Sequence, residues 1–171
     1  MRTVAYMPLA VDSPLAAYRA AAAAQDTGAM LACMRDDVVL TSPITDRFKF
    51  VGKAQLRDLL EDVHAVVAEP VYREDTGDDR TRLLVVSGRV GRQRFDEALL
   101  VTLDDDGLIA RFELFIRPLP GLTALAAALG PRVAGRRGRV RALAVRAMIA
   151  PLAFLTARGE GAATKLASPA P

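Results

Sequence analysis

Hydrophobic and polar residues follow a helical period in three segments of the first 67 residues. From Lys53 to Val67, leucines and valines recur every three or four positions and charged residues lie opposite them, which predicts an amphipathic helix. Ser13-Pro14 predicts the start of another helix that reaches Gln25, because serine caps helix N-termini and proline fits the first turn. A short helix near Ala29–Arg35 is expected after the break at Asp26-Thr27-Gly28.

Other segments, from residue 38 onward, are short and rich in β-branched residues, which are typical of strands. Val38–Ser42 is the first of them, and a loop over Pro43–Val51 is expected after it. Turns rich in Gly and Asp then separate further strands, which predicts an antiparallel meander. Helices followed by strands, rather than an alternation of the two, indicate an α+β fold. The further strands are expected near Val71–Thr76, Arg82–Val90, Arg94–Leu103 and Leu108–Arg117.

Charge divides the chain near residue 130. The 171 residues have a net charge of +3, but residues 131–171 hold eight basic side chains and a single acid, Glu160. The first 130 residues therefore have a net charge of −4, which gives them no electrostatic reason to bind nucleic acid. The lone cysteine, Cys33, excludes an internal disulfide and a cysteine-rich metal site. We expect a cytoplasmic protein, because the N-terminus does not resemble a signal peptide and charges interrupt every long apolar run.

Three segments follow from this division. Residues 1–130 are expected to form the folded domain, residues 131–158 a basic and apolar helical extension, and residues 159–171 a disordered tail. A helix over Gly121–Leu129 should stop at Gly130-Pro131, and the extension helix, Gly135–Arg158, should be interrupted at Pro151. Two interpretations of the extension helix stay open, contact with an anionic lipid surface and packing on protein. Its scattered apolar positions favour packing on the domain or on a second subunit.

Several motifs carry a resemblance to a known family. They are Tyr18-Arg-Ala-Ala, Asp36-Asp-Val-Val-Leu-Thr-Ser-Pro43, Gly52-Lys-Ala-Gln-Leu-Arg, and Asp104-Asp-Asp-Gly107-Leu-Ile. In this order and spacing the chain resembles the nuclear transport factor 2-like superfamily over residues 13–130, and its SnoaL-like and ketosteroid isomerase-like branch most closely. The resemblance implies a cone-shaped barrel, in which a curved antiparallel sheet is covered by the N-terminal helices, with the C-terminal helices as an extension. The superfamily includes isomerases, epoxide hydrolases, polyketide cyclases and binding proteins without catalysis, so the fold does not choose the function.

The residues of ketosteroid isomerase are only partly matched. Tyr18 corresponds in placement to the oxyanion-hole tyrosine of that family. The family's basic aspartate directly precedes a proline, where this chain has Ser42, and its protonated aspartate corresponds to Leu99. Serine does not abstract a proton from carbon without a base, and leucine does not donate a hydrogen bond. We therefore expect no conventional ketosteroid isomerisation.

Three residues are candidate catalytic groups: Tyr18 as a hydrogen-bond donor, and Glu97 or His64 as a base. Tyr18 lies on the apolar side of its helix, as either a ligand donor or a core tyrosine. Glu97 shares strand parity with Leu99, and is either a base with a raised pKa in an apolar cavity or a rim carboxylate paired with Arg89 or Arg94. His64, the only histidine, lies beside the apolar stripe of its helix.

The resemblance places an apolar cavity inside the cone. Two function classes stay open: a binding protein for a small hydrophobic molecule, which we favour, and an enzyme (isomerase, hydratase, epoxide hydrolase or polyketide-type cyclase) that uses Tyr18 with Glu97 or His64. No metal or nucleotide cofactor is implied, and a homodimer through the outer sheet face, where Arg111 and Glu113 lie, is expected. The predicted ligand-binding residues are Tyr18, Met34, Ser42, Leu60, Val63, Leu99, Val101, Phe112, Leu114 and Ile116.

Overall fold

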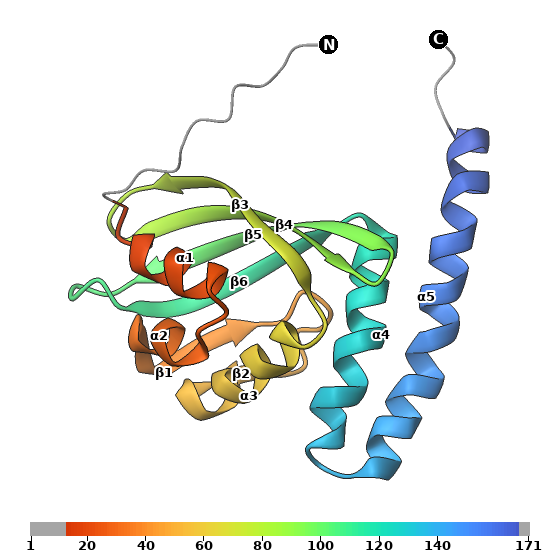
Figure 1. Ribbon diagram of the computed structural model, residues 1–171, viewed down its shortest axis with the longest axis horizontal. Helices are drawn as coiled ribbons and strands as arrows, with labels where there is room; N and C mark the ends of the chain where they lie inside the picture. The colour runs from red at the N-terminus through yellow and green to blue at the C-terminus, as the bar shows by residue number, and fades with distance from the viewer. Residues whose placement is uncertain (1–12, 168–171) are drawn as a thin grey trace.

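Six strands form one curved sheet, and helices cover its inner face (Figure 1). The computed structural model describes residues 13–167. The elements in chain order are α1 (Ala16–Ala23), α2 (Thr27–Ala32), β1 (Met34–Thr41), β2 (Lys49–Val51), α3 (Gly52–His64), β3 (Ala68–Gly77), β4 (Thr81–Val90), β5 (Gln93–Leu103), β6 (Ile109–Arg117), α4 (Leu119–Gly135) and α5 (Arg139–Ala167).

The sheet has the strand order β2-β1-β6-β5-β4-β3 and does not close. The strands β3 to β6 form the predicted antiparallel meander, and the expected turn at Asp106-Gly107 joins β5 to β6. The prediction of an antiparallel sheet is wrong at one position, because β1 runs parallel to β6, with Leu40 opposite Phe112. The helix α3 and four strands separate these two neighbours in the chain, so no local turn signal revealed the pairing. The predicted loop over Pro43–Val51 also contains the short strand β2.

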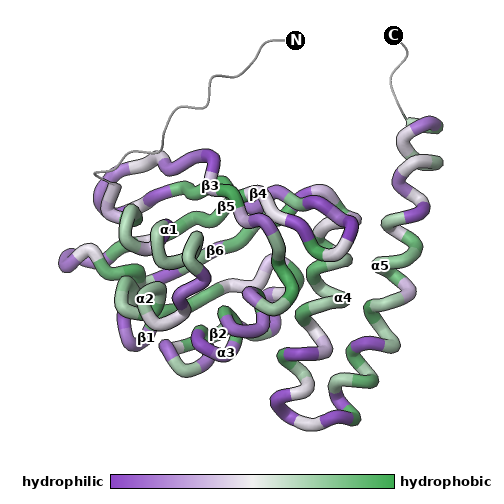
Figure 2. Tube along the Cα trace, in the orientation of Figure 1, coloured by the Kyte–Doolittle hydropathy of each residue, from purple (hydrophilic) through white to green (hydrophobic). Residues whose placement is uncertain are grey.

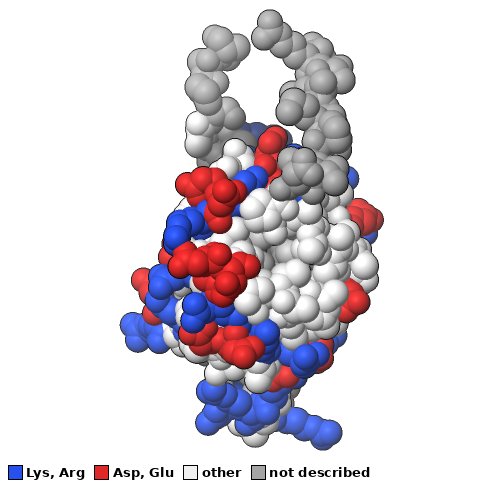
Figure 3. Space-filling view, turned by 90° about the vertical axis from the view of Figure 1, so that its left-hand side faces the viewer, with Lys and Arg blue, Asp and Glu red and all other residues white. Residues whose placement is uncertain are grey.

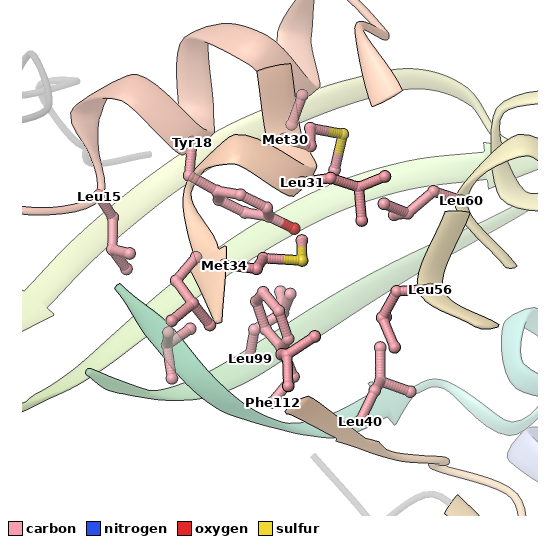
Figure 4. Close-up of a cluster of buried hydrophobic side chains, with 14 of the residues drawn as sticks. Leu15, Tyr18, Met30, Leu31, Met34, Leu40, Leu56, Leu60, Leu99 and Phe112 are labelled. Carbon is pink, nitrogen blue, oxygen red and sulfur yellow. The ribbon is translucent and has the colours of Figure 1, made fainter. Parts of the chain in front are cut away.

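The core lies between the inner face of the sheet and the first three helices (Figure 4). Leu56 and Leu60 of α3 enter it from one side and Leu15 and Tyr18 from another, as the helical spacing predicted. Burial of such apolar side chains is the main stabilising contribution to the fold. The Asp26 side chain caps α2 by accepting a hydrogen bond from the Ala29 amide at 2.9 Å, which ends the expected break between α1 and α2.

A buried ion-pair cluster fixes α1 against the far edge of the sheet. The fully buried Asp75 carboxylate of β3 lies 3.1 Å from Arg19 Nε of α1 and accepts a hydrogen bond from Arg82 Nε of β4 at 2.7 Å. Charges without access to water are stable in a protein only when they are paired in this way. The cluster therefore holds the N-terminal helix over the sheet edge that later contributes Tyr72 to the cavity.

The helix α4 packs across the outer end of the cone and begins at the close contact between Gly121 and β5. A Cβ atom at Gly121 would lie 2.5 Å from the Arg94 carbonyl oxygen and 2.7 Å from Phe95 Cβ, so only glycine fits there. A second apolar cluster, centred on Val90, Phe95 and Leu125, forms at this contact. The sequence predicted that this helix stops before Pro131, but α4 continues to Gly135.

The last helix, α5, packs beside α4 as a helical hairpin, and its length also differs from the prediction. It continues through Pro151 and as far as Ala167, so residues 159–167 are helical rather than disordered. The remaining predicted tail and residues 1–12 lie outside the described residues. Interior prolines cost a helix about 3 kcal/mol, but contacts between α4 and α5 offset this cost. Gly130 allows the closest approach, since a Cβ atom there would lie 3.1 Å from Val145 Cγ1 and 3.3 Å from Ile149 Cδ1.

The helix α5 is unusually exposed for its composition (Figure 2). No residue of Arg139–Ala167 is buried, although an 18-residue window within it has a mean hydropathy of 1.6. By length and composition alone, this helix could cross a membrane. No such helix was expected from the sequence, because charged residues interrupt every long apolar run, but the apolar window of α5 contains no more than two of them.

Candidate functional site

A cavity of about 850 Å³ occupies the cone and extends to the α4–α5 hairpin. Its walls are mostly apolar side chains of the sheet, α3 and α4. Of the predicted ligand-binding residues, only Val101 does not line it. Val101 is instead fully buried in the core cluster that also contains Leu15, Val38 and Ile109. The predicted residues that line the cavity are Tyr18, Met34, Ser42, Leu60, Val63, Leu99, Phe112, Leu114 and Ile116.

Tyr18 projects from α1 into the cone, with its hydroxyl directed toward the sulfur of Met34 (Figure 4). Its ring packs against Phe112 with 5.5 Å between centroids and a tilt of 42°. Burial raises the pKa of Tyr18 well above its ordinary value, and the charges of Tyr72 and Glu97 raise it further. The hydroxyl therefore stays protonated, so it can donate a hydrogen bond to an oxygen atom in the cavity.

Glu97 lies on the cavity side of β5, directly opposite Val86 of β4 and Ile116 of β6. Burial raises its pKa from 4.5 to about 7. The side chain keeps some accessible surface because it faces the cavity. The alternative of a carboxylate paired with Arg89 is wrong, because Arg89 pairs with Glu69 at 2.7 Å. A carboxyl group that titrates near neutral pH inside an apolar cavity can both accept and return a proton.

Tyr72 completes this polar group and was not predicted from the sequence. Tyr72 on β3 lies opposite Val86, which lies opposite Glu97, so all three side chains share the cavity face of the sheet. Burial and the charge of Glu97 raise the pKa of Tyr72. The alternation of side chains along β3 could have placed Tyr72 on the cavity face. Its alignment with Glu97, however, depends on bulges in the pairing of β3 with β4, which the sequence does not reveal.

His64 and Ser42 also line the cavity but already have partners of their own. His64 Nδ1 lies 3.3 Å from Thr27 Oγ1 of α2, and burial lowers the pKa of the imidazole. Ser42 Oγ accepts a hydrogen bond from the Ile44 amide at 3.2 Å. Glu97 is therefore the stronger candidate for a base, because its pKa is raised by the cavity itself.

The outer part of the cavity is formed by residues that the domain prediction assigned to the extension. Ala144, Val145 and Ile149 of α5 line it together with Val133 of α4, and the exposed Arg137 and Arg141 lie at its edge. Among residues 13–167, no group of three or more His, Cys, Asp or Glu side chains could hold a metal ion. The chemistry available in the described part of the chain is thus hydrogen bonding by tyrosine and proton transfer by carboxylate or imidazole.

Comparison with known proteins connects this geometry to a family. No family model matches the chain, and no curated protein matches it. Among solved structures, a steroid delta-isomerase from Pseudomonas aeruginosa is 27% identical, with a TM-score of 0.66, and the match covers 77% of this chain and 98% of that one. A nuclear transport factor 2-like protein from Burkholderia xenovorans is 22% identical, with a TM-score of 0.51, over 68% of this chain and 92% of that one. The chain has the fold of the nuclear transport factor 2-like superfamily.

Its structural neighbours lie in the SnoaL-like and ketosteroid isomerase-like branch of that superfamily, as the sequence motifs indicated. An epoxide hydrolase/cyclase-like enzyme of pyran ring formation in the polyether salinomycin has a TM-score of 0.53 at 15% identity, over 61% of this chain and 88% of that one. Such a likeness shows the shared fold alone. The predicted fold class is confirmed, and the branch is one of small-molecule binding or isomerase-like proteins.

Proposed function

We propose that the chain binds a small hydrophobic molecule inside the cone, without conventional ketosteroid isomerisation. The single observation that carries this proposal is the cavity of about 850 Å³ with mostly apolar walls. This volume falls within the roughly 300–1,000 Å³ that is typical of small-molecule sites. Ser42 and Leu99 at the two aspartate positions of the isomerase family support the exclusion of its usual chemistry.

The polar groups in the cavity indicate what kind of molecule it would hold. Tyr18, Tyr72 and Glu97 are its inner polar groups, and apolar side chains surround them. A ligand with an apolar body and an oxygen acceptor directed toward Tyr18 would fit this arrangement, because the Tyr18 hydroxyl can donate a hydrogen bond to that oxygen.

Native mass spectrometry of the purified protein tests the proposal directly. We expect a retained hydrophobic molecule that is released on denaturation. A Leu114→Trp variant should lose it, because Leu114 lines the cavity. The matched control is Phe115→Trp, one residue further along β6, where the side chain is 58% exposed on the outer face. If both variants retained the molecule, binding in the cone would be contradicted. The same holds if neither the wild type nor Phe115→Trp retained any molecule after incubation with apolar probes.

A second function, proton transfer within the same cavity, is favoured by the pKa of Glu97. In this reaction the Glu97 carboxylate removes a proton from a carbon next to a carbonyl group, and the Tyr18 hydroxyl stabilises the enolate oxygen. The proton then returns from Glu97 to the same or a conjugated carbon, so an isomer is formed with no other reactant. Enolate stabilisation by a buried donor is a large contribution in such sites.

Deuterium exchange separates this second function from binding alone. The molecule released from the wild type should gain deuterium when it is incubated with the protein in heavy water at pH 8. A Glu97→Gln variant should retain the molecule but exchange at least about 10²-fold more slowly, as expected for loss of a positioned base. Equal exchange rates in the two proteins would exclude Glu97 as the base and leave the binding function unaffected.

A further inference from the structure

The exposed helix α5 has two different faces. One face contacts α4: Val145 and Ile149 pack over Gly130, Ala142 lies beside Gly135, and the Thr156 and Thr123 hydroxyls are 2.6 Å apart. At 100° per residue, the opposite face carries Val140, Ala147, Pro151 and Phe154. The large apolar side chains away from α4 are exposed; Val140, for example, is 81% exposed and Met148 77%. An apolar face of this length that none of residues 13–167 covers is typical of an interaction surface.

Basic side chains border this apolar face. On the same helical projection, Arg139 and Arg146 lie along one flank and Arg141 along the other. Near the other end of the helix, the Arg158 guanidinium lies over the Phe154 ring, 4.5 Å from the ring centroid, so a cation–π contact places a further positive charge beside the exposed aromatic side chain. The single acid of residues 131–171 is Glu160. Lys and Arg side chains also gather at the end of the molecule where the α4–α5 turn lies (Figure 3).

We propose that this face of α5 docks on the surface of an anionic lipid bilayer, with the helix lying along the membrane. A helix with an apolar face and basic flanks has the composition of interfacial helices. The attraction between several exposed arginines and anionic headgroups adds to the burial of the apolar face. In Figure 1, α5 forms the outer edge of the molecule, so a flat surface can approach it along its length.

Two alternatives are less favourable, a second copy on this face because of its charges and a membrane-spanning α5 because of its packing. A second copy of α5 packed face to face would bring basic side chains of the two copies together, because Arg139, Arg141 and Arg146 would meet the same residues in a parallel pair and the end with Arg158 and Lys165 in an antiparallel pair. A membrane-spanning α5 would have to leave α4, and the buried Thr123 and the packing at Gly130 would lose their contacts. A bilayer surface needs neither change.

The same arrangement brings the cavity close to the lipid. Arg141, which lies on one flank of the docking face, also lines the outer part of the cavity, and so does Ala144 of the same helix. A hydrophobic ligand could then pass between bilayer and cone with a short path through water. The docking proposal does not depend on this consequence, because it rests on α5 alone.

Co-sedimentation of the full chain with lipid vesicles tests the proposal. We expect binding at low salt to vesicles of phosphatidylcholine with about 30% phosphatidylglycerol, and at least about 10-fold weaker binding to phosphatidylcholine alone or at 0.5 M salt. Phe154→Ser should weaken binding several-fold. Its matched control is Phe115→Ser, because the two phenylalanines are 55% and 58% exposed on different faces. Arg139→Glu should weaken binding at least about 5-fold, unlike Arg92→Glu in the β4–β5 turn.

Three results would overturn the proposal. The first is no vesicle binding at low salt, and the second is an equal effect of each α5 variant and its control. The third is binding that resists both 1 M salt and alkaline carbonate, which would indicate a spanning helix instead. If the protein binds no vesicles but forms a dimer that Phe154→Ser disrupts, the face belongs to a second copy of the chain.

Discussion

The Arg136 guanidinium donates a hydrogen bond to Asp62 Oδ2 at 3.0 Å, which joins the end of α4 to α3. The same side chain also lies 2.7 Å from Asp58 Oδ1 and donates to the Asp58 carbonyl oxygen at 2.8 Å. One arginine thus holds the α4–α5 turn against the helix that forms one wall of the cavity. The position of α5, and with it the outer cavity wall, depends on this contact.

Removal of one charge from this contact should loosen the hairpin. We expect Asp62→Asn to lower the free energy of unfolding by about 1 kcal/mol, the usual size of a half-buried charged hydrogen bond. Amide hydrogen exchange should become faster in α5 while it stays unchanged in β4 and β5. The control is Asp79→Asn in the exposed β3–β4 turn. If amide exchange became faster throughout the molecule, or if its rate in α5 did not change, Arg136 would not be the residue that positions the hairpin.

A methyl group at Gly121 should separate α4 from the sheet. The new Cβ atom would lie only 2.5 Å from the Arg94 carbonyl oxygen, so the backbone has to move. We expect Gly121→Ala to destabilise the protein by roughly 1–3 kcal/mol, which is typical of overpacking. The matched control is Gly159→Ala in α5, where a Cβ meets no atom within 4 Å, and alanine should be neutral or slightly stabilising. Urea denaturation measures both, and equal stabilities of the two variants would contradict the close contact.

The raised pKa of Glu97 should make stability depend on pH. Because the pKa rises from 4.5 to about 7 on folding, the native state binds more protons than the unfolded state between these values. The free energy of unfolding should therefore fall as pH increases from about 4.5 to about 7, by up to roughly 3 kcal/mol. Glu97→Gln should flatten this part of the pH profile and stabilise the protein at pH 8. An unchanged profile in urea denaturation at pH 5, 6 and 8 would contradict a buried carboxyl group.

Substitution of Tyr18 should distinguish the two proposed functions. Tyr18→Phe keeps the ring contact with Phe112 and removes only the hydroxyl. If the protein only binds its ligand, affinity should fall by about 1 kcal/mol, the value of one hydrogen bond. If Tyr18 stabilises an enolate, deuterium exchange into the ligand should fall about 10²-fold or more. Affinity by calorimetry and exchange by mass spectrometry, compared on one preparation, separate these outcomes. No change in either would show that the hydroxyl does not contact the ligand.

The sequence by itself determined much of the fold, because its signals are local. The apolar stripe of α3, the Asp26 break and the turn at Asp106-Gly107 each predict their element from neighbouring residues, and the structure confirms all three. The order of helices and strands, together with the motif around Tyr18, also indicated the fold that the structural neighbours share. Glu97 was found as an acid by its strand parity with Leu99.

Tertiary structure alone decided the features that depend on distant residues. The parallel pairing of β1 with β6 and the line from Tyr72 through Val86 to Glu97 follow from register across bulged strands, which has no local signal. The helices through Pro131 and Pro151 persist because α4 and α5 pack together, which outweighs the propensity that predicted breaks. The same packing covers one face of α5 with α4. The opposite face stays exposed, because α4 reaches only one side of the helix.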